Sequence, residues 1–370
     1  MKVVFWVAAF LTFYTYIGYF CWLWLRARWK AESSARQAVL PTVSVIVAVR
    51  NEGARLRAKI SNLLACDYPR ELLQLIFVSD GSADETDSIL RESQAQVEPL
   101  FLAQSQGKAA ALNAGIAAAR GEILLFTDAR QQFEPQAIRY LVARFVEPQV
   151  GCVSGELMLR PSAGDGTAGF GFYWTLEKKI RQLESIGGSV IGATGAIYAA
   201  RRTVVRDLPV GTILDDVLIP MRILKDRYRV VFEPRALAWD SLSELRGHEF
   251  RRKVRTLFGN YQLIGLAPWL LTAGNPALFN FVSHKVLRLL GPLFLLALLL
   301  AAAVVDGPFY RLALLMQLLF YGLALLSLAH PRISPVRKLA DAASAFVSLN
   351  AAAVLAFVYF VSGKKGVWVR

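Results

Sequence analysis

The sequence predicts an α/β fold in which helices cover both faces of a mostly parallel sheet, joined to transmembrane and interfacial α-helices. Apolar strand-like runs alternate with helix-like runs between about residues 40 and 260, which is typical of such a sheet. Apolar segments of membrane length lie on either side of that region. Hydrophobic residues make up 55% of the chain and the mean hydropathy is +0.40, which is high for a purely soluble protein.

The first predicted span is Val3–Leu25, a stretch of 23 residues without a charge. A cleaved signal peptide is the rival reading. The run is too long, contains aromatic residues throughout and is followed by no small-residue cleavage site, so we expect an uncleaved span. The basic residues that follow place this end in the cytoplasm by the positive-inside rule: Arg26, Arg28, Lys30 and Arg36.

Three further apolar spans are predicted at Leu289–Val305, Leu312–Ala329 and Ala342–Val361. Basic residues between the last two should also be cytoplasmic: Arg332, Arg337 and Lys338. Four spans put Lys364, Lys365 and Arg370 on the outer side, against the same rule. Tyr261–Leu271 is a candidate interfacial segment, with Trp269 at headgroup level.

The predicted sheet begins with Thr42–Val49, a β-branched and nearly continuously apolar run expected of a strand buried on both faces. The further strands and helices follow in alternation: helix Ala54–Leu64, strand Leu73–Val78, helix Thr86–Glu92, strand Pro99–Leu102, helix Lys108–Ala119, strand Glu122–Phe126 and, later, helix Val217–Asp226. Ligands of such sheets bind beyond the carboxyl ends of the strands. Polar side chains follow three of these strands at that edge: Asn51 and Glu52, then Asp80, then Asp128.

The net charge and the absence of two nucleotide-binding motifs limit the classes of ligand that this protein is expected to bind. A net charge of +14 suits nucleic acid, anionic lipid or a nucleotide diphosphate, and the apolar spans favour the last two, so no nucleic-acid partner is expected. The sequence has no GxGxxG and no GxxxxGK[ST], which argues against dinucleotide redox chemistry and a P-loop. Three scattered cysteines without CxxC argue against a disulfide framework.

Three residues of the α/β region are candidates for donor binding. Asp80, in VSDGS, either caps a turn or accepts hydrogen bonds from a base or ribose. Asp128 either occupies a plain turn or holds Mg²⁺ or Mn²⁺, which would bridge diphosphate oxygens. Lys108 either is a solvated lysine at a helix start or adds positive charge near the phosphates.

Two motifs nearer the C-terminal spans are candidates for proton transfer and for binding a leaving group. Asp215 and Asp216 either cap the following helix or supply a general base for an acceptor hydroxyl. The basic run RRKVR either lies on anionic lipid or holds a departing diphosphate, because Arg252 and Arg255 share one helix face.

In this order the motifs resemble the membrane-embedded, processive-type branch of the family-2 glycosyltransferases, which includes hyaluronan, chitin and cellulose synthases. The resemblance covers roughly Pro41 to Tyr261 and rests on PTVSVIVAVRNE, IFVSDGSADET, GKAAALNAGIAAARGEILLFTDA, GATGAIYAARR, LDDVLIPMRI and RRKVRT. It implies a GT-A fold and inverting transfer from a nucleotide-diphosphate donor, UDP by preference.

The resemblance also implies roles for the candidate residues. Asp80 would contact the uridine, with Asn51 and Glu52 nearby, and Asp128 would bind the metal. Asp216 would be the base, with Asp215 beside it, and Arg252 and Arg255 would lie near the diphosphate and the acceptor. Two motifs depart from the family pattern: Arg130 stands at the second acidic position of DxD, and in QxxRW Arg252 replaces Gln and Thr256 replaces Trp.

Three functions remain open at this point: sugar addition to a polysaccharide or oligosaccharide, single glycosylation of a membrane lipid, and an inactive scaffold subunit of an export complex. Four spans make a small channel, so polymer export would need associated chains or an export partner. The expected location is the plasma (inner) membrane with residues 31–280 cytoplasmic. The expected domains are a transmembrane helix over 1–30, a cytoplasmic GT-A domain over 31–258, interfacial helices over 259–285 and transmembrane helices over 286–370.

Overall fold

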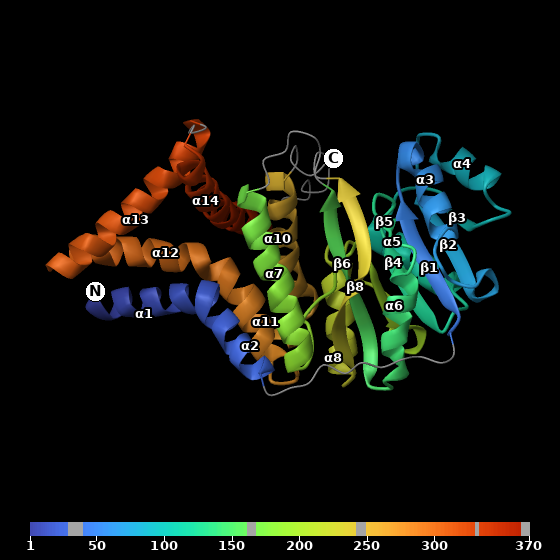
Figure 1. The fold of residues 1–370 in the computed structure, drawn as a ribbon, viewed down its shortest axis with the longest axis horizontal. Coiled ribbons are helices and arrows are strands. Elements are labelled where there is room, and N and C mark those ends of the chain that lie inside the picture. The colour runs from blue at the N-terminus through green and yellow to red at the C-terminus, as the bar shows by residue number, and fades with distance from the viewer. Residues whose placement is uncertain (29–39, 161–167, 242–248, 330–332, 364–370) are drawn as a thin grey trace.

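The computed structural model describes residues 1–28, 40–160, 168–241, 249–329 and 333–363. Figure 1 shows an α/β part and, beside it, a group of projecting helices that includes α1, α12 and α13. Several basic residues used above to predict topology lie outside the described residues: Lys30, Arg36, Arg332, Lys364, Lys365 and Arg370.

Within the described residues, eight strands form one mixed sheet in the order β3-β2-β1-β4-β7-β6-β8-β5. Four of its seven neighbouring pairs are parallel, and β7 and β5 make the antiparallel ones. The strands are β1 (Val43–Val49), β2 (Leu73–Asp80), β3 (Glu98–Leu102), β4 (Ile123–Thr127), β5 (Gln132–Phe133), β6 (Val150–Arg160), β7 (Tyr198–Arg201) and β8 (Arg229–Ser241).

The register brings the carboxyl ends of β1, β2 and β4 to one edge. Val49 pairs with Ser79 across β1 and β2, and Val47 pairs with Thr127 across β1 and β4. The loops that leave these strands therefore start side by side, as expected for a ligand-binding edge of a parallel sheet.

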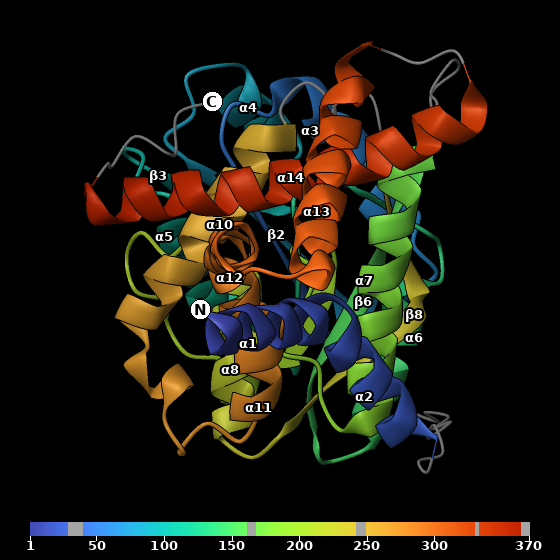
Figure 2. The same cartoon turned by 90° about the vertical axis from the view of Figure 1, so that its left-hand side faces the viewer.

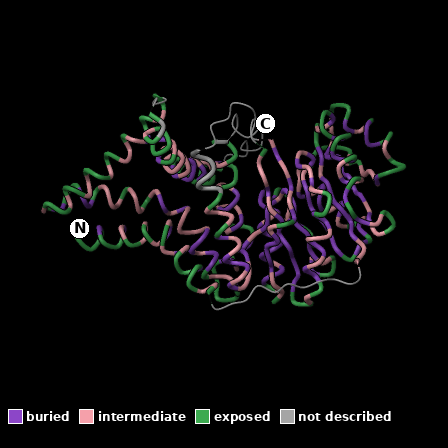
Figure 3. Tube along the Cα trace, in the orientation of Figure 1, coloured by how far each residue is buried: buried purple, intermediate pink, exposed green. Residues whose placement is uncertain are grey.

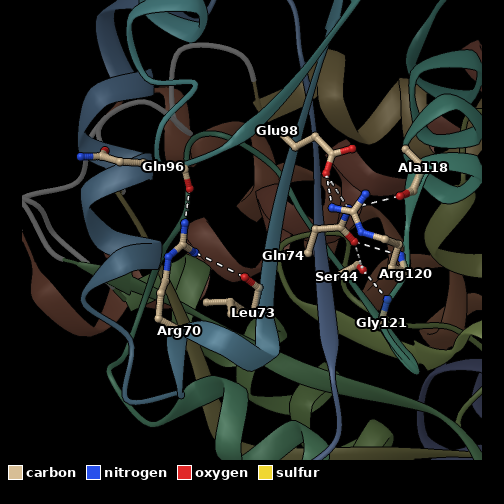
Figure 4. Close-up of polar contacts among 9 residues, drawn as sticks. All are labelled: Ser44, Arg70, Leu73, Gln74, Gln96, Glu98, Ala118, Arg120 and Gly121. Carbon is tan, nitrogen blue, oxygen red and sulfur yellow. Dashed lines mark hydrogen bonds and ion pairs between the residues drawn. The ribbon is translucent and has the colours of Figure 1, made fainter.

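A polar ladder fixes the opposite edge of the same strands (Figure 4). The Ser44 hydroxyl donates to Gln74 Oε1 over 2.6 Å and accepts the Gly121 N–H over 2.8 Å. Gln74 Nε2 donates to Glu98 Oε2 over 2.7 Å, and the Arg120 guanidinium meets the same carboxylate at 2.7 Å. These bonds tie β1, β2, β3 and the start of β4 in register, because buried polar groups must find partners.

Helices cover both faces of the sheet, as predicted, and the most deeply buried residues lie along the strands (Figure 3). Side chains alternate along β1, so Val45 and Val47 enter one cluster while Ile46 enters the other. One face carries α3 (Gly53–Leu64), α4 (Thr86–Glu92) and α6 (Ala137–Ala143), and the other carries α5 (Lys108–Ala118) and α8 (Asp215–Lys225).

The second face also receives the elements that lead to the membrane. Leu263, Leu270 and Phe281 complete its core. They belong to α10 (Glu249–Leu266), η5 (Pro268–Leu271) and α11 (Leu278–Phe281). Trp269 is half-buried with the Lys225 ammonium 4.8 Å above its ring, so this segment is seated on the α/β part.

In the part of the chain that the structure describes, four helical stretches are long and apolar enough to cross a membrane, matching the four predicted: Lys2–Ala27, Leu278–Val304, Pro308–Ala329 and Pro335–Val361. The first contains α1 (Lys2–Phe13), the π-helical turn η1 (Tyr14–Gly18) and α2 (Tyr19–Ala27). The others contain α11, the π-helical turn η6 (Val282–Val286), α12 (Leu287–Val304), α13 (Pro308–Leu326), the 3₁₀ turn η7 (Ser327–Ala329) and α14 (Ser334–Val361).

The predicted strands and helices up to β4 agree with the observed ones within one or two residues. The sequence did not predict α6, the remaining strands or the 20-residue helix α7 (Ala168–Gly187). The proposed boundary at residue 258 falls inside α10, which is continuous there, so the domain limits stay predictions.

Candidate active site

The loops after β1 and β2 are joined to each other by their polar residues. Asn51 has a positive φ of 53°, a conformation that asparagine tolerates. Its Oδ1 accepts the Ala83 N–H over 2.8 Å, and its own N–H donates to Ser82 Oγ over 3.2 Å. The Glu52 N–H donates to Thr86 Oγ1 over 2.9 Å. Two predicted donor-binding residues therefore shape one loop pair at the carboxyl edge.

Asp80 is buried and holds the loop that leads into α5. Its carboxylate accepts hydrogen bonds from the Ser105 hydroxyl over 2.9 Å, the Gln106 N–H over 2.7 Å and the Gly107 N–H over 3.0 Å. Gly81 has a φ of +59°, and a side chain there would meet the Ser105 nitrogen at 2.6 Å. Asp80 thus fixes the position of the residue that follows this loop, Lys108.

Lys108 lies between two of the predicted carboxylates. Its Nζ is 3.0 Å from Asp128 Oδ1 and 3.2 Å from Asp215 Oδ1. Burial opposes the charge on Lys108, but Asp128 and Asp215 outweigh it and raise the pKa of the lysine. Burial likewise opposes ionisation of Asp128, and the Lys108 charge holds the pKa of that carboxyl below its ordinary value. This ion pair brings α5, β4 and α8 together.

Asp216 occupies the first turn of α8 beside the loop before β7. Its Oδ2 accepts the Gly195 N–H over 3.0 Å, and a side chain at Gly195 would come within 3.2 Å of that oxygen. Burial and the charge of Asp215 raise the pKa of Asp216 to about 6. A carboxyl with that pKa is ionised at neutral pH and still basic enough to take a proton.

Arg130 is held by a carboxylate that the sequence analysis did not single out. Its Nε donates to Asp240 Oδ2 over 2.8 Å, and Gln131 Nε2 donates to the same oxygen over 2.9 Å. Asp240 is buried at the end of β8. An acidic residue directly after the short apolar run Ala236–Trp239 was the signal that could have indicated it.

The basic helix face predicted from RRKVR lies beside this loop. Arg252 and Arg255 are on α10, three positions apart and therefore on one face. Partial desolvation and the nearby charge of Arg130 lower the pKa of Arg252, while Asp240 and Asp128 oppose that change. The first turns of α10 thus carry positive charge toward the Asp128 loop.

A buried lysine lies beneath the Asp128 loop and was also missed. The Lys59 ammonium donates to Thr127 Oγ1 over 3.0 Å and to the Gln131 carbonyl over 2.6 Å, on either side of Asp128. Its side chain lies 4.3 Å from the centre of the Phe133 ring. Burial lowers the pKa of Lys59 to about 7, although the Asp128 charge opposes the shift. A polar residue on the buried face of a predicted helix was its only signal.

Tyr198 supports the other end of the site. Its hydroxyl donates to Asp215 Oδ2 over 3.3 Å, and its ring stacks on Phe126 at 4.7 Å. Thr127 Oγ1 also donates to the Ala196 carbonyl over 2.7 Å. These contacts join the end of β4 to the segment that enters β7, and they tie β7 to Asp215.

The described residues contain no cluster of three histidine, cysteine or acidic side chains that could form a closed metal cage. Asp128 offers a single carboxylate whose side chain is 39% exposed. That donor set fits Mg²⁺ or Mn²⁺ held mainly by substrate phosphates and water, because such ions are often bound through one or two carboxylates only.

A mixed α/β sheet with acidic residues and a basic helix at its carboxyl edge defines a nucleotide-sugar-transferase type of site. Residues 44–208 match the model of the family described as Glycosyl transferase family 2. Residues 44–208, which include the strand ends that carry Asp80 and Asp128, thus form a family-2 glycosyltransferase domain.

The curated relatives include poly-beta-1,6-N-acetyl-D-glucosamine synthases. That of Staphylococcus epidermidis is 26% identical over 229 residues, which cover 60% of this chain and 55% of the relative. That of Staphylococcus aureus (strain COL) is 25% identical over 232 residues, covering 61% of this chain and 56% of the relative. The chain thus spans little more than half the length of these relatives.

Among solved structures, the mannosyltransferase PcManGT from Pyrobaculum calidifontis, in complex with GDP-Man and Mn²⁺, has a similar fold. Its TM-score is 0.71 at 23% identity, over 98% of this chain and 100% of that chain. The predicted GT-A fold is confirmed by this similarity, which extends through the membrane-length helices.

Proposed function

We propose that the protein transfers a sugar, with inversion, from a nucleotide-diphosphate donor to a carbohydrate acceptor at a membrane. The observation that carries the proposal is the Lys108 bridge, which joins Asp128 to Asp215 at the carboxyl edge of the sheet, next to Asp216. A UDP-sugar is the first donor to test, and a GDP-sugar is the second because PcManGT was solved with GDP-Man.

The donor would lie along the carboxyl edge, with its nucleotide near the first two strands. Asn51, Glu52 and Asp80 would shape the nucleotide pocket, since they order the loops there. Arg252 and Arg255 would neutralise the diphosphate from α10, because guanidinium groups pair well with phosphate oxygens. Lys108 would act from the opposite side of the phosphates.

Asp128 would hold a divalent ion, Mg²⁺ or Mn²⁺, together with the donor phosphates. Such an ion stabilises the negative charge that develops on a departing diphosphate. Lys108 and the bonds from Lys59 to Thr127 and Gln131 keep the Asp128 loop in place for this role.

Asp216 would be the general base. A sugar hydroxyl is a weak nucleophile, so its proton must leave as the new bond forms. The Gly195 N–H orients Asp216 Oδ2. Asp215 is bound by Lys108 and Tyr198, so it would raise the basicity of Asp216 rather than take the proton itself.

The acceptor would be an oligosaccharide or polysaccharide, by analogy with the poly-beta-1,6-N-acetyl-D-glucosamine synthases. Single transfer to a membrane lipid is the second candidate, and Thr256 in place of the family's tryptophan favours it. In either case we propose a plasma-membrane protein whose catalytic domain faces the cytoplasm, where nucleotide sugars are made.

Purified protein in detergent or lipid, incubated with a panel of nucleotide sugars and Mn²⁺ or Mg²⁺, tests this proposal. Release of the free nucleotide diphosphate identifies the donor. Sizing of the product then separates a polymer from a once-glycosylated lipid. Absence of donor turnover with every acceptor class would favour an inactive, scaffold-like subunit.

A further inference from the structure

Helix α14 lies crosswise to the other membrane-length helices. In Figure 1, α1 and α12 extend away from the α/β part along the long axis of the molecule. Figure 2 looks down that axis: α12 is seen end-on, whereas α14 runs side-on across the view. In the same view α13 is also seen from the side, and α14 crosses its direction.

The buried side of α14 is a row of alanines that seats the helix on α10. Ala352 and Ala356 pack with Val254 of α10. Beyond them, the Phe360 ring lies 6.0 Å from Phe258, and Phe357 lies 5.6 Å from Tyr261. The C-terminal half of α14 is thus fixed to the helix that carries Arg252 and Arg255, at the boundary with the α/β part.

The middle of α14 contacts the first and third membrane-length helices. Asn350 Oδ1 accepts a hydrogen bond from the Tyr16 hydroxyl over 3.0 Å. Phe346 packs on Tyr16 at 4.7 Å and on Phe320 of α13 at 5.5 Å. Helix α14 therefore touches α10, η1 and α13 along its length.

Length and composition do not separate a crossing from an in-plane helix. A helix of 28 residues is about 42 Å long, which exceeds the ~30 Å hydrocarbon core. The basic residues at the two ends of α14 distinguish a helix that crosses the membrane from one that lies in its plane. Arg337 and Lys338 lie in the first turns of α14, and Lys364 and Lys365 follow its end. A crossing would place one of these basic pairs outside, whereas an in-plane helix keeps both on the cytoplasmic side.

We propose that α14 lies in the plane of the membrane interface, on the side of the catalytic domain, and does not cross the bilayer. Its partner is the lipid at the boundary between headgroups and acyl chains. Apolar side chains on its outer surface are 49–67% exposed and suit that environment: Leu339, Val354, Val358 and Val361. Three crossings then remain, and Ser362, directly after α14, lies on the same side as the α/β part.

Labelling of single cysteines tests the inference independently of the enzymatic activity. Cys66 and Cys152 are buried, so a Cys21→Ala background suffices. Three exposed positions outside the proposed site are then replaced one at a time: Ala95→Cys in the α/β part, Asp306→Cys between α12 and α13, and Ser362→Cys at the end of α14. The readout is the fraction labelled by a membrane-impermeant maleimide in intact cells, relative to permeabilised cells, so differences in intrinsic reactivity cancel.

We expect Ser362→Cys to behave like Ala95→Cys and opposite to Asp306→Cys. That result holds whichever side of the membrane the catalytic domain occupies. Ser362→Cys labelled like Asp306→Cys would show that α14 crosses the bilayer and would overturn the inference.

Discussion

Lys108 is the residue through which the acidic groups of the site are connected. It pairs with Asp128 and Asp215 at once, and Asp80 fixes the loop that leads to it. A salt bridge of this kind is poor evidence for stability, because desolvation offsets much of the attraction. Its value lies in geometry: the carboxylates from β4 and α8 are held facing one space, where a diphosphate and its cation would be bound.

The raised pKa of Asp216 predicts the pH dependence of transfer. Burial and Asp215 raise that pKa to about 6, so the base is protonated and inactive below it. We expect kcat to fall about tenfold per pH unit below pH 6. The folded state also binds this proton more tightly than the unfolded chain, so the stability contributed by protonation is lost as pH rises through 6. Measurement of kcat from pH 4.5 to 8 checks this acidic fall in activity, and a flat profile would contradict the role of Asp216.

The metal role of Asp128 predicts a dependence on added cation. Asp128→Ala should abolish transfer, and a chelator should do the same to the wild type until Mn²⁺ or Mg²⁺ is restored. Asp226→Ala serves as the control, because Asp226 pairs only with Arg206 among the contacts described at the far end of α8. Full activity in the presence of a chelator would contradict a role for the metal. It would indicate that Arg130 neutralises the diphosphate instead.

At the scale of elements, α10 and α14 form the junction between the site and the membrane. The alanines of α14 leave no space for a larger side chain, whereas the opposite side of the same helix is open. The position of the arginine-bearing face of α10 therefore depends on how closely α14 packs against it.

This packing can be tested with a matched pair of substitutions. Ala352 is fully buried, so Ala352→Trp should destabilise the protein by ~1–3 kcal/mol through overpacking and lower its melting temperature in detergent. Val354 is 49% exposed, so Val354→Trp should leave the melting temperature nearly unchanged. Equal melting temperatures for the two variants would mean that α14 is not seated on α10 as described.

The elements that the sequence predicted share a strong local signal. β1 to β4 are nearly continuous apolar runs with helices between them, and their registers then follow from a parallel sheet. β8 was missed because Glu233, Pro234 and Arg235 interrupt its apolar pattern. β7 was missed because it has only four residues.

The same distinction applies to the site. Asp80, Asp128, Asp215 and Asp216 could be predicted because they follow apolar runs or begin a helix. The contacts that hold the loops around them could not, because pairs such as Lys59 with Gln131 or Arg130 with Asp240 join residues far apart in the chain. In the same way, apolar length predicted α14 as a span, and only its packing against α10 and η1 indicates another orientation.

At the scale of the whole molecule, one face of the sheet joins the membrane helices while its carboxyl edge carries the site. The Leu263, Leu270 and Phe281 contacts make the membrane elements part of that face's core. An acceptor held at the bilayer would thus meet a donor bound at the sheet edge, with Asp216 between them.

The most direct test of this account is the turnover of Asp216→Asn with the donor that the wild type uses. Asparagine has nearly the same size as aspartate and its Oδ1 can still accept the Gly195 N–H, so donor binding and melting temperature should stay near normal. Transfer should fall by about 10² or more, because the base is gone. Near-normal transfer by Asp216→Asn would contradict the proposed mechanism and would move the role to Asp215.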